Sequence, residues 1–105
     1  MKAVFHLNES HRIDSALSNI RNILKMEDVL QVILLINGEA INLFKDPDFT
    51  IDILSDNFTI NACANSMKSN NVQKSELLPY TVVLESGVYT LTILQCNEGY
   101  AYIKP

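Results

Sequence analysis

Residues 29–36 read Val-Leu-Gln-Val-Ile-Leu-Leu-Ile, and this stretch decides the fold. Apart from Gln31 it is continuously apolar, and most of its side chains are branched. A strand with one solvated face alternates apolar and polar residues, whereas a strand of a parallel sheet is covered on both faces and is apolar throughout. Val29 to Ile36 is therefore predicted to be a buried strand of a parallel sheet.

Four further stretches are expected to form strands on either side of this one. Phe58 to Cys63 alternates as a strand should, and the others are short runs rich in branched or aromatic residues. These other strands are Lys2 to Leu7, Thr81 to Glu85 and Tyr100 to Lys104.

Helical segments are expected between the strands. Ser10 is a suitable N-cap for a helix with apolar residues at helical spacing, which are Ile13, Ala16, Leu17, Ile20 and Leu24. Shorter helical segments are expected at Ala40 to Lys45, Thr50 to Ser55 and Ala64 to Asn71. Val88 to Leu94 favours a strand by propensity, whereas the flanking Ser86 and Gly99 favour a helix. Alternating strands and helices predict an α/β fold with a parallel sheet.

The size of the chain fits a single domain, residues 1–105, because no linker, repeat or low-complexity tract divides it. Hydrophobic residues make up 48% of the sequence and charged residues 19%. A chain this short has little interior in which to bury so many apolar side chains. We therefore expect a subunit interface to cover part of its apolar surface.

The charge pattern argues against nucleic acid and membranes as partners. The net charge is -4, and the eight Lys and Arg residues are scattered along the chain. Surfaces that bind nucleic acid usually carry clustered positive charge. The longest apolar stretch is Val29 to Ile36, and a membrane span needs about 20 residues.

The two cysteines, Cys63 and Cys96, do not form a CxxC motif, and the N-terminus lacks the apolar core of a signal peptide. A cytoplasmic protein with reduced thiols is therefore expected. The histidines and cysteines do not have the spacing of metal ligands, and no GxGxxG or P-loop motif is present. No metal and no organic cofactor are expected.

The carboxyl ends of the expected strands meet at one edge of a parallel sheet, where ligands of such sheets bind. Polar or small residues follow four of the strands at this edge: Asn8, Asn37, Asn65, and Ser86 with Gly87. We expect these residues to line a pocket that can hold an anion. His6, late in the first strand, is either a base for the nearby Cys63 or a half-buried histidine with satisfied hydrogen bonds.

Cys63 is the candidate for covalent chemistry, because it ends the third strand and opens the following helix. The free N–H groups and the partial positive charge of a helix N-terminus favour the thiolate over the thiol. The alternative is a packed residue, since free cysteines are among the most buried residue types. Cys96 is read as a packing residue, with the further possibility that it resolves an oxidised Cys63.

Three segments resemble the short DsrE/DsrF-like proteins, a family related to sulfur-relay subunits. They are Val4-Phe5-His6-Leu7-Asn8-Glu9, then Ala62-Cys63-Ala64-Asn65-Ser66-Met67 with Leu77-Leu78-Pro79, and finally Glu85-Ser86-Gly87-Val88 with Gly99-Tyr100-Ala101-Tyr102-Ile103-Lys104-Pro105. The resemblance implies a three-layer α/β/α fold with a five-stranded parallel sheet of order 4-3-2-1-5. It also implies a helix over Val88 to Asn97 and a homo-oligomer, either a trimer or a hexamer.

The resemblance further implies a role for Cys63, because the sulfur-relay members carry a persulfide on a cysteine just after the third strand. Those members tend to follow the cysteine with an Arg-Gly element, where this chain has Lys68-Ser69-Asn70-Asn71. We therefore expect a sulfur carrier or sulfurtransferase-like protein that exchanges sulfur with a donor or acceptor protein through Cys63. The alternative is a non-enzymatic oligomeric module that binds a small anion or a partner protein at the same edge of the sheet.

Overall fold

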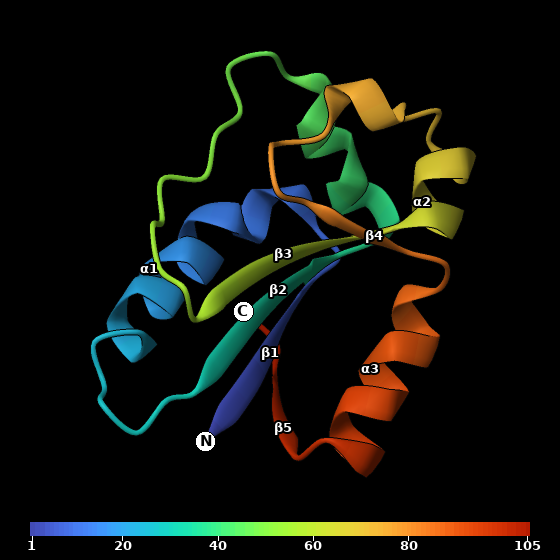
Figure 1. Ribbon diagram of the computed structural model, residues 1–105. Helices are drawn as coiled ribbons and strands as arrows, with labels where there is room; N and C mark the ends of the chain where they lie inside the picture. The colour runs from blue at the N-terminus through green and yellow to red at the C-terminus, as the bar shows by residue number, and fades with distance from the viewer.

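The computed structural model describes residues 1–105 as one α/β domain (Figure 1). Short 3-10 helices, labelled η, supplement the strands and α-helices. In chain order the elements are β1 (Lys2–Leu7), η1 (Ser10–Arg12), α1 (Ile13–Ile23), β2 (Gln31–Ile36), η2 (Gly38–Lys45), β3 (Phe58–Cys63), α2 (Ala64–Ser69), η3 (Lys74–Glu76), β4 (Val82–Leu84), α3 (Gly87–Asn97) and β5 (Tyr100–Ile103).

All five strands are parallel, and their order in the sheet is β4-β3-β2-β1-β5. Both the parallel arrangement and the order confirm the sequence-based expectation. Parallel neighbours cannot be joined by a hairpin, so each connection crosses a face of the sheet and usually contains a helix. The direction in which the strand order runs then decides which face each helix covers.

The two faces of the sheet are covered unequally, as Figure 1 shows. Residues from α1, η2 and α2 pack on one face and form a core of 16 buried residues with β1, β2 and β3. On the other face only α3 contributes, through Leu91 and Leu94, to a smaller core of five buried residues. Together the helices and the sheet make the three-layer α/β/α architecture.

The buried strand β2 is shorter at its start than the apolar run that predicts it. Val32, Leu34, Leu35 and Ile36 are fully buried, whereas Leu30 is 66% exposed. The N–H of Leu30 donates to the carbonyl of Met1, so the chain is still turning toward the sheet at this residue. The sheet therefore takes up the apolar run only from Gln31 onward.

Two local expectations were wrong, and a third was right about a helix but not about its start. Ser10 does not cap the first helix, because its hydroxyl donates to Glu39 Oε2 at 2.7 Å and a 3-10 turn precedes α1. The helix expected over Ala40 to Lys45 is present and ends at Lys45, but it begins at Gly38 and is a 3-10 helix. Thr50 to Ser55 contains no helical turn.

The segment that local rules left open, Val88 to Leu94, lies in helix α3. The Ser86 hydroxyl accepts the N–H of Tyr89 at 3.2 Å and so caps the start of this helix. Gly99, with φ of +73°, turns the chain into β5 after the helix ends. The capping residues thus predicted this segment better than the strand propensity of its interior. Neither α3 nor any other helix has the length and apolarity needed to cross a membrane.

The burial of β2 makes a prediction about stability. Leu34 is fully buried in the larger core, so we expect L34A to lower the free energy of unfolding by about 2–5 kcal/mol. The matched control is L30A, at an exposed position just before the strand, which should change it by less than about 0.5 kcal/mol. Urea unfolding followed by circular dichroism measures both, and equal effects would contradict the assignment of β2 as the structural centre.

Candidate functional site

The carboxyl ends of the strands bring together the segments that follow β1, β2, β3 and β4. Contacts between these segments are polar. The N–H of Ser10 donates to Glu39 Oε1 at 2.8 Å, and the N–H of Gly38 donates to Ser66 Oγ at 2.8 Å. The edge that was expected from the sequence is therefore a connected surface of loop and helix-start residues.

Cys63 lies at this edge as the last residue of β3 and the N-cap residue of α2. Its side chain points to the face that α3 covers, and the N–H of Gly87, at the start of α3, donates to its Sγ at 3.2 Å. Only 4% of Cys63 is exposed. The sulfur is thus held between the starts of two helices, α2 and α3, with little of it open to solvent.

Opposing effects act on the pKa of the Cys63 thiol. Burial raises it, whereas hydrogen bonding from the Ser66 hydroxyl and from the backbone N–H groups of Ser66, Gly87 and Asn65 lowers it. The donors prevail, and the pKa of Cys63 lies below its ordinary value. The Cys63 side chain makes no capping hydrogen bond to α2. The lowered pKa therefore comes from several donors together and not from one strong hydrogen bond to that helix.

The orientation of Ser66 is set by Gly38. Because the Ser66 oxygen already accepts the Gly38 N–H, its own hydrogen is free to point elsewhere, and Cys63 is the acceptor next to it. Gly38 has φ of +57°, a conformation that side chains rarely adopt. A Cβ there would also lie 3.3 Å from the Asn8 carbonyl oxygen, so glycine is favoured at this position.

Gly87 is a second closely packed glycine at the site. A Cβ added to it would lie 3.1 Å from Asn37 Nδ2 and 3.2 Å from Leu35 Cδ2. Leu35 lies in β2 and Asn37 just after it, and both side chains pack directly against the backbone that donates to Cys63. The absence of a side chain at Gly87 lets the start of α3 approach both β2 and the sulfur.

His6 is engaged away from Cys63. Its Nε2 lies 2.7 Å from Asn37 Oδ1 and its Nδ1 lies 2.6 Å from the Tyr102 hydroxyl. With the Asn37 oxygen facing it, Nε2 carries the proton and Nδ1 accepts from Tyr102. Both ring nitrogens are thus occupied, so His6 is the half-buried, hydrogen-bonded histidine of the two readings and not a base in contact with Cys63.

The environment of His6 keeps the ring neutral. Burial lowers its pKa, the hydrogen bond to Asn37 raises it, and the positive charge of Lys104 lowers it further. The net pKa lies below the ordinary value of histidine. Lys104 itself donates to the side-chain oxygen of Asn8, which ties the C-terminal segment to the end of β1.

The other expected site residues divide into two groups. Asn65 is exposed, and its backbone N–H lowers the pKa of Cys63. The Ser86 hydroxyl accepts the Tyr89 N–H and caps α3. Asn8 and His6 lie on the β1 side and contact Lys104 and Tyr102. The structure therefore gathers Asn65, Gly87 and Asn37 around or next to Cys63, whereas nothing shows Asn8 or His6 in contact with the sulfur.

Three residues of the site were not found from the sequence. Ser66 stands three residues after the N-cap position, which is where a capping partner is normally found, so its spacing could have revealed it. Tyr102 and Lys104 could not be found by local rules, because they reach the site only through the pairing of β5 with β1.

Cys96 is exposed near the end of α3, so it is not the packing residue expected from the sequence. Gly87 touches Cys63 at the start of the same helix, and nine residues of helix correspond to about 14 Å. A disulfide needs Cα atoms within about 7 Å. The two cysteines therefore cannot pair in this fold, and the possibility that Cys96 resolves an oxidised Cys63 is dropped. No cluster of three His, Cys, Asp or Glu side chains is present that could hold a metal.

No protein-family model and no curated protein matches this chain. Among solved structures it is similar to MTH1491, a protein of unknown function from Methanobacterium thermoautotrophicum, with a TM-score of 0.85 and 26% sequence identity. The similarity covers 99% of this chain and 98% of that one. The two chains thus share a fold over their whole length, and the likeness brings no activity with it.

The contact between Gly87 and Cys63 makes a prediction about thiol reactivity. We expect G87A to push α3 away from Leu35 and Asn37, to lengthen the bond to the sulfur and to raise the pKa of Cys63. The rate at which iodoacetamide alkylates Cys63, measured against pH, should then rise only at higher pH than in the wild type. The control is G99A, which strains a glycine of positive φ with open space around it at the far end of α3. An unchanged pH profile in G87A would show that this donor does not tune the thiol.

The lowered pKa of His6 makes a prediction about stability and pH. The unfolded chain binds a proton at His6 below about pH 6.5, while the folded chain takes it up only at lower pH. Between these values the unfolded state holds more protons, so stability falls as the pH falls. We expect H6Q to weaken this dependence between about pH 7.5 and about pH 5.5. Urea unfolding at both pH values, with H11Q as control at an exposed position, measures the effect; equal slopes in H6Q and wild type would contradict it.

Proposed function

We propose that this protein is a sulfur carrier that holds a sulfane sulfur as a persulfide on Cys63. One observation carries the proposal: the Gly87 N–H donates to the Cys63 sulfur at 3.2 Å, and together with Ser66 and Asn65 it lowers the pKa of the thiol in spite of its burial. Such donors stabilise the thiolate more than the neutral thiol, and the thiolate is the nucleophile of cysteine chemistry. The resemblance to the DsrE/DsrF-like proteins supports the same residue and the same chemistry.

The chemistry requires no cofactor. The Cys63 thiolate attacks the outer sulfur of a donor such as thiosulfate, a new S–S bond forms, and the S–S bond of the donor breaks. Sulfite leaves with the bonding electron pair, and Cys63 becomes a persulfide. In the return step an acceptor thiolate attacks the terminal sulfur, which restores the Cys63 thiolate. No net oxidation or reduction occurs in either step.

The surroundings of Cys63 suit a small donor. With 4% of the residue exposed, the sulfur does not stand free for docking against a large reaction partner. The same N–H groups that lower the thiol pKa are available to the negative charge of the persulfide, because they belong to helix starts that point at the sulfur. Asn37 packs against Gly87, and Ser86 precedes it in the chain, so both polar side chains lie beside the start of α3.

The burial of Cys63 is also the observation that favours the second candidate. In that reading the protein is a non-enzymatic module that binds a small anion or a partner protein at this edge, and Cys63 is a packed helix-start residue. The expected homo-oligomer serves both readings. It is supported by the exposed apolar side chains of Val88 and Tyr89 on α3, the helix that covers its face of the sheet alone.

A mass measurement tests the proposal. After incubation with thiosulfate and removal of the excess, the intact protein should gain the mass of one sulfur atom. The gain should survive in C96S, which removes the exposed cysteine, and disappear in C63S. Dithiothreitol should reverse it. A gain that depends on Cys96, or none at all while Cys63 resists alkylation in the folded protein, would overturn the sulfur-carrier proposal in favour of the binding module.

A further inference from the structure

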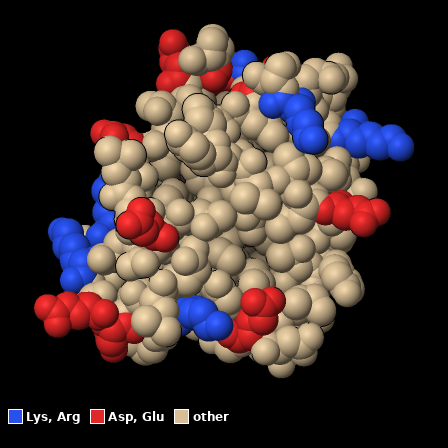
Figure 2. Space-filling model, viewed as in Figure 1, with Lys and Arg blue, Asp and Glu red and all other residues tan.

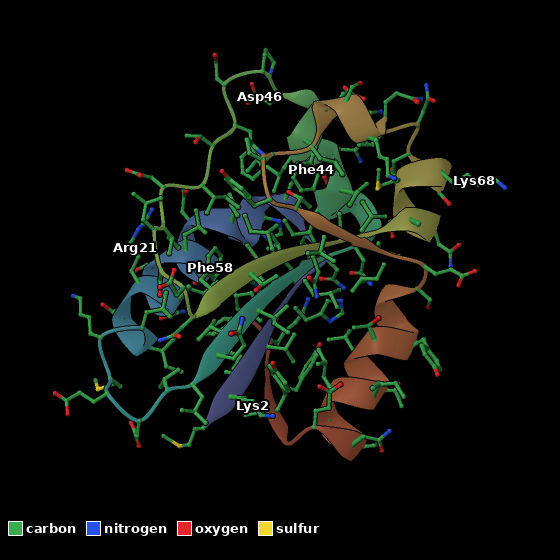
Figure 3. All side chains as sticks on the ribbon, viewed as in Figure 1. Lys2, Arg21, Phe44, Asp46, Phe58 and Lys68 are labelled. Carbon is green, nitrogen blue, oxygen red and sulfur yellow. The ribbon has the colours of Figure 1, made fainter.

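A second feature lies at the opposite end of β3 from Cys63. A groove of about 920 Å³ runs beside the start of this strand. The loop before β3 forms one wall and the segment Leu78 to Val82 the other. Phe58 and Ile60 point to one face of the sheet and Thr59 to the other, yet all three line the groove, so it follows the edge of the strand and not one of its faces. Figure 3 shows Phe58 at this end of β3.

The floor of the groove is an unpaired stretch of strand. β4 pairs only with Asn61, Ala62 and Cys63, which leaves Phe58 to Ile60 without a neighbour on this side. The carbonyl of Asn57 accepts the N–H of Val32 in β2, and successive peptide groups of a strand point in opposite directions. The carbonyl of Phe58 and the N–H of Ile60 therefore face the groove. Neither takes part in the loop hydrogen bonds that flank it.

The chain keeps its own backbone away from this edge. A longer β4 would place Tyr80 opposite Thr59, but Pro79 has no N–H to donate and Tyr80 has φ of +66°. The N–H and the hydroxyl of Thr81 both donate to the Leu78 carbonyl and hold this segment in a turn. A left-handed conformation at a tyrosine costs free energy, and such strain is commonly found at functional positions.

The rim of the groove exposes apolar side chains. Tyr80 is 96% exposed, Leu54 97% and Val82 50%. Asp56 is the single charged residue among those that line it. In Figure 2, which views the molecule from this side, Lys, Arg, Asp and Glu lie mainly around the margin and leave the middle of the face uncharged. The surface therefore offers apolar contacts, one negative charge, and a free backbone donor and acceptor.

We propose that this groove binds an extended peptide segment of a partner protein, which adds to the sheet beside β3. A strand that pairs with an exposed edge gains main-chain hydrogen bonds, and alternate side chains then select the sequence. Here the segment would bond the Ile60 N–H and the Phe58 carbonyl, place an aliphatic side chain between Leu54 and Tyr80, and carry a Lys or Arg toward Asp56. This site is separate from Cys63 and does not depend on the sulfur chemistry.

The probe is the fluorescein-labelled peptide Thr-Val-Lys-Val-Thr-Val, and its binding to the full chain is followed by fluorescence polarisation. We expect saturable binding and a shift of the Ile60 amide signal in nuclear magnetic resonance spectra. The same peptide N-methylated at every residue keeps its side chains but has no N–H with which to pair as a strand, so it should not bind. Absence of saturation with the unmethylated peptide up to about 1 mM, the weak limit of specific binding, would overturn the proposal.

Variants test the groove without disturbing the core. L54A should weaken binding about tenfold and D56N about threefold, because they remove one exposed apolar contact and one surface charge pair. Y80G separates binding from folding: it should weaken binding while the free energy of unfolding is kept or raised, since glycine accepts the positive φ. L30A, exposed but outside the groove, is the control and should bind like the wild type.

Two further outcomes are decisive. C63S should bind the peptide as the wild type does. Failure of the sulfur-carrier proposal therefore does not affect the peptide proposal, and failure of the peptide proposal does not affect the sulfur-carrier proposal. If the wild type is an oligomer that L54D dissociates, as measured by light scattering, a second copy of the chain covers the groove. That result would overturn the peptide as its occupant.

Discussion

The burial of β2 on both faces is the constraint on which the rest of the structure depends. Because Val32, Leu34 and Ile36 point to one face and Ile33 and Leu35 to the other, helices must cover both sides of the sheet. Helices reach both sides only through crossover connections, and these keep all the strands parallel. Every strand then ends at the same edge. The meeting of Cys63 with the start of α3 follows from this arrangement, since the two are 24 residues apart in sequence.

The chemistry at that edge is a balance between two opposing effects of the same packing. Bringing α3 close enough to donate the Gly87 N–H also removes the sulfur from water, and burial favours the neutral thiol. The donors prevail because they come from more than one segment: Asn65 and Ser66 from α2, and Gly87 from α3. Two glycines make this convergence possible, one by admitting β2 side chains next to α3 and the other by adopting a positive φ that orients Ser66.

The sequence predicts the strands better than the links between them. Apolar runs such as Gln31 to Ile36 are specified by burial, and burial is what hydrophobic patterns record. Ser10 failed as a cap because Glu39, 29 residues away, offered its hydroxyl a charged acceptor. Cys63 was found as the end of a strand and the start of a helix. Its surroundings were only partly found, because the Gly87 contact arises from helix docking that no local pattern encodes. The contacts of His6 with Tyr102 and of Asn8 with Lys104, elsewhere at this edge, likewise depend on the pairing of β5 with β1.

The two ends of β3 are set by different stretches of the chain. At its carboxyl end the strand pairs with β4 over Asn61 to Cys63, and this pairing delivers the chain to Ser86 and the start of α3. At its amino end the strand is open because Pro79 and Tyr80 delay the start of β4. A change at Pro79 or Tyr80 could lengthen β4 and close the groove while leaving the register at Cys63 intact, because parallel strands extend from either end without a shift in pairing. The reactive edge and the open edge can therefore vary independently, although they share one strand.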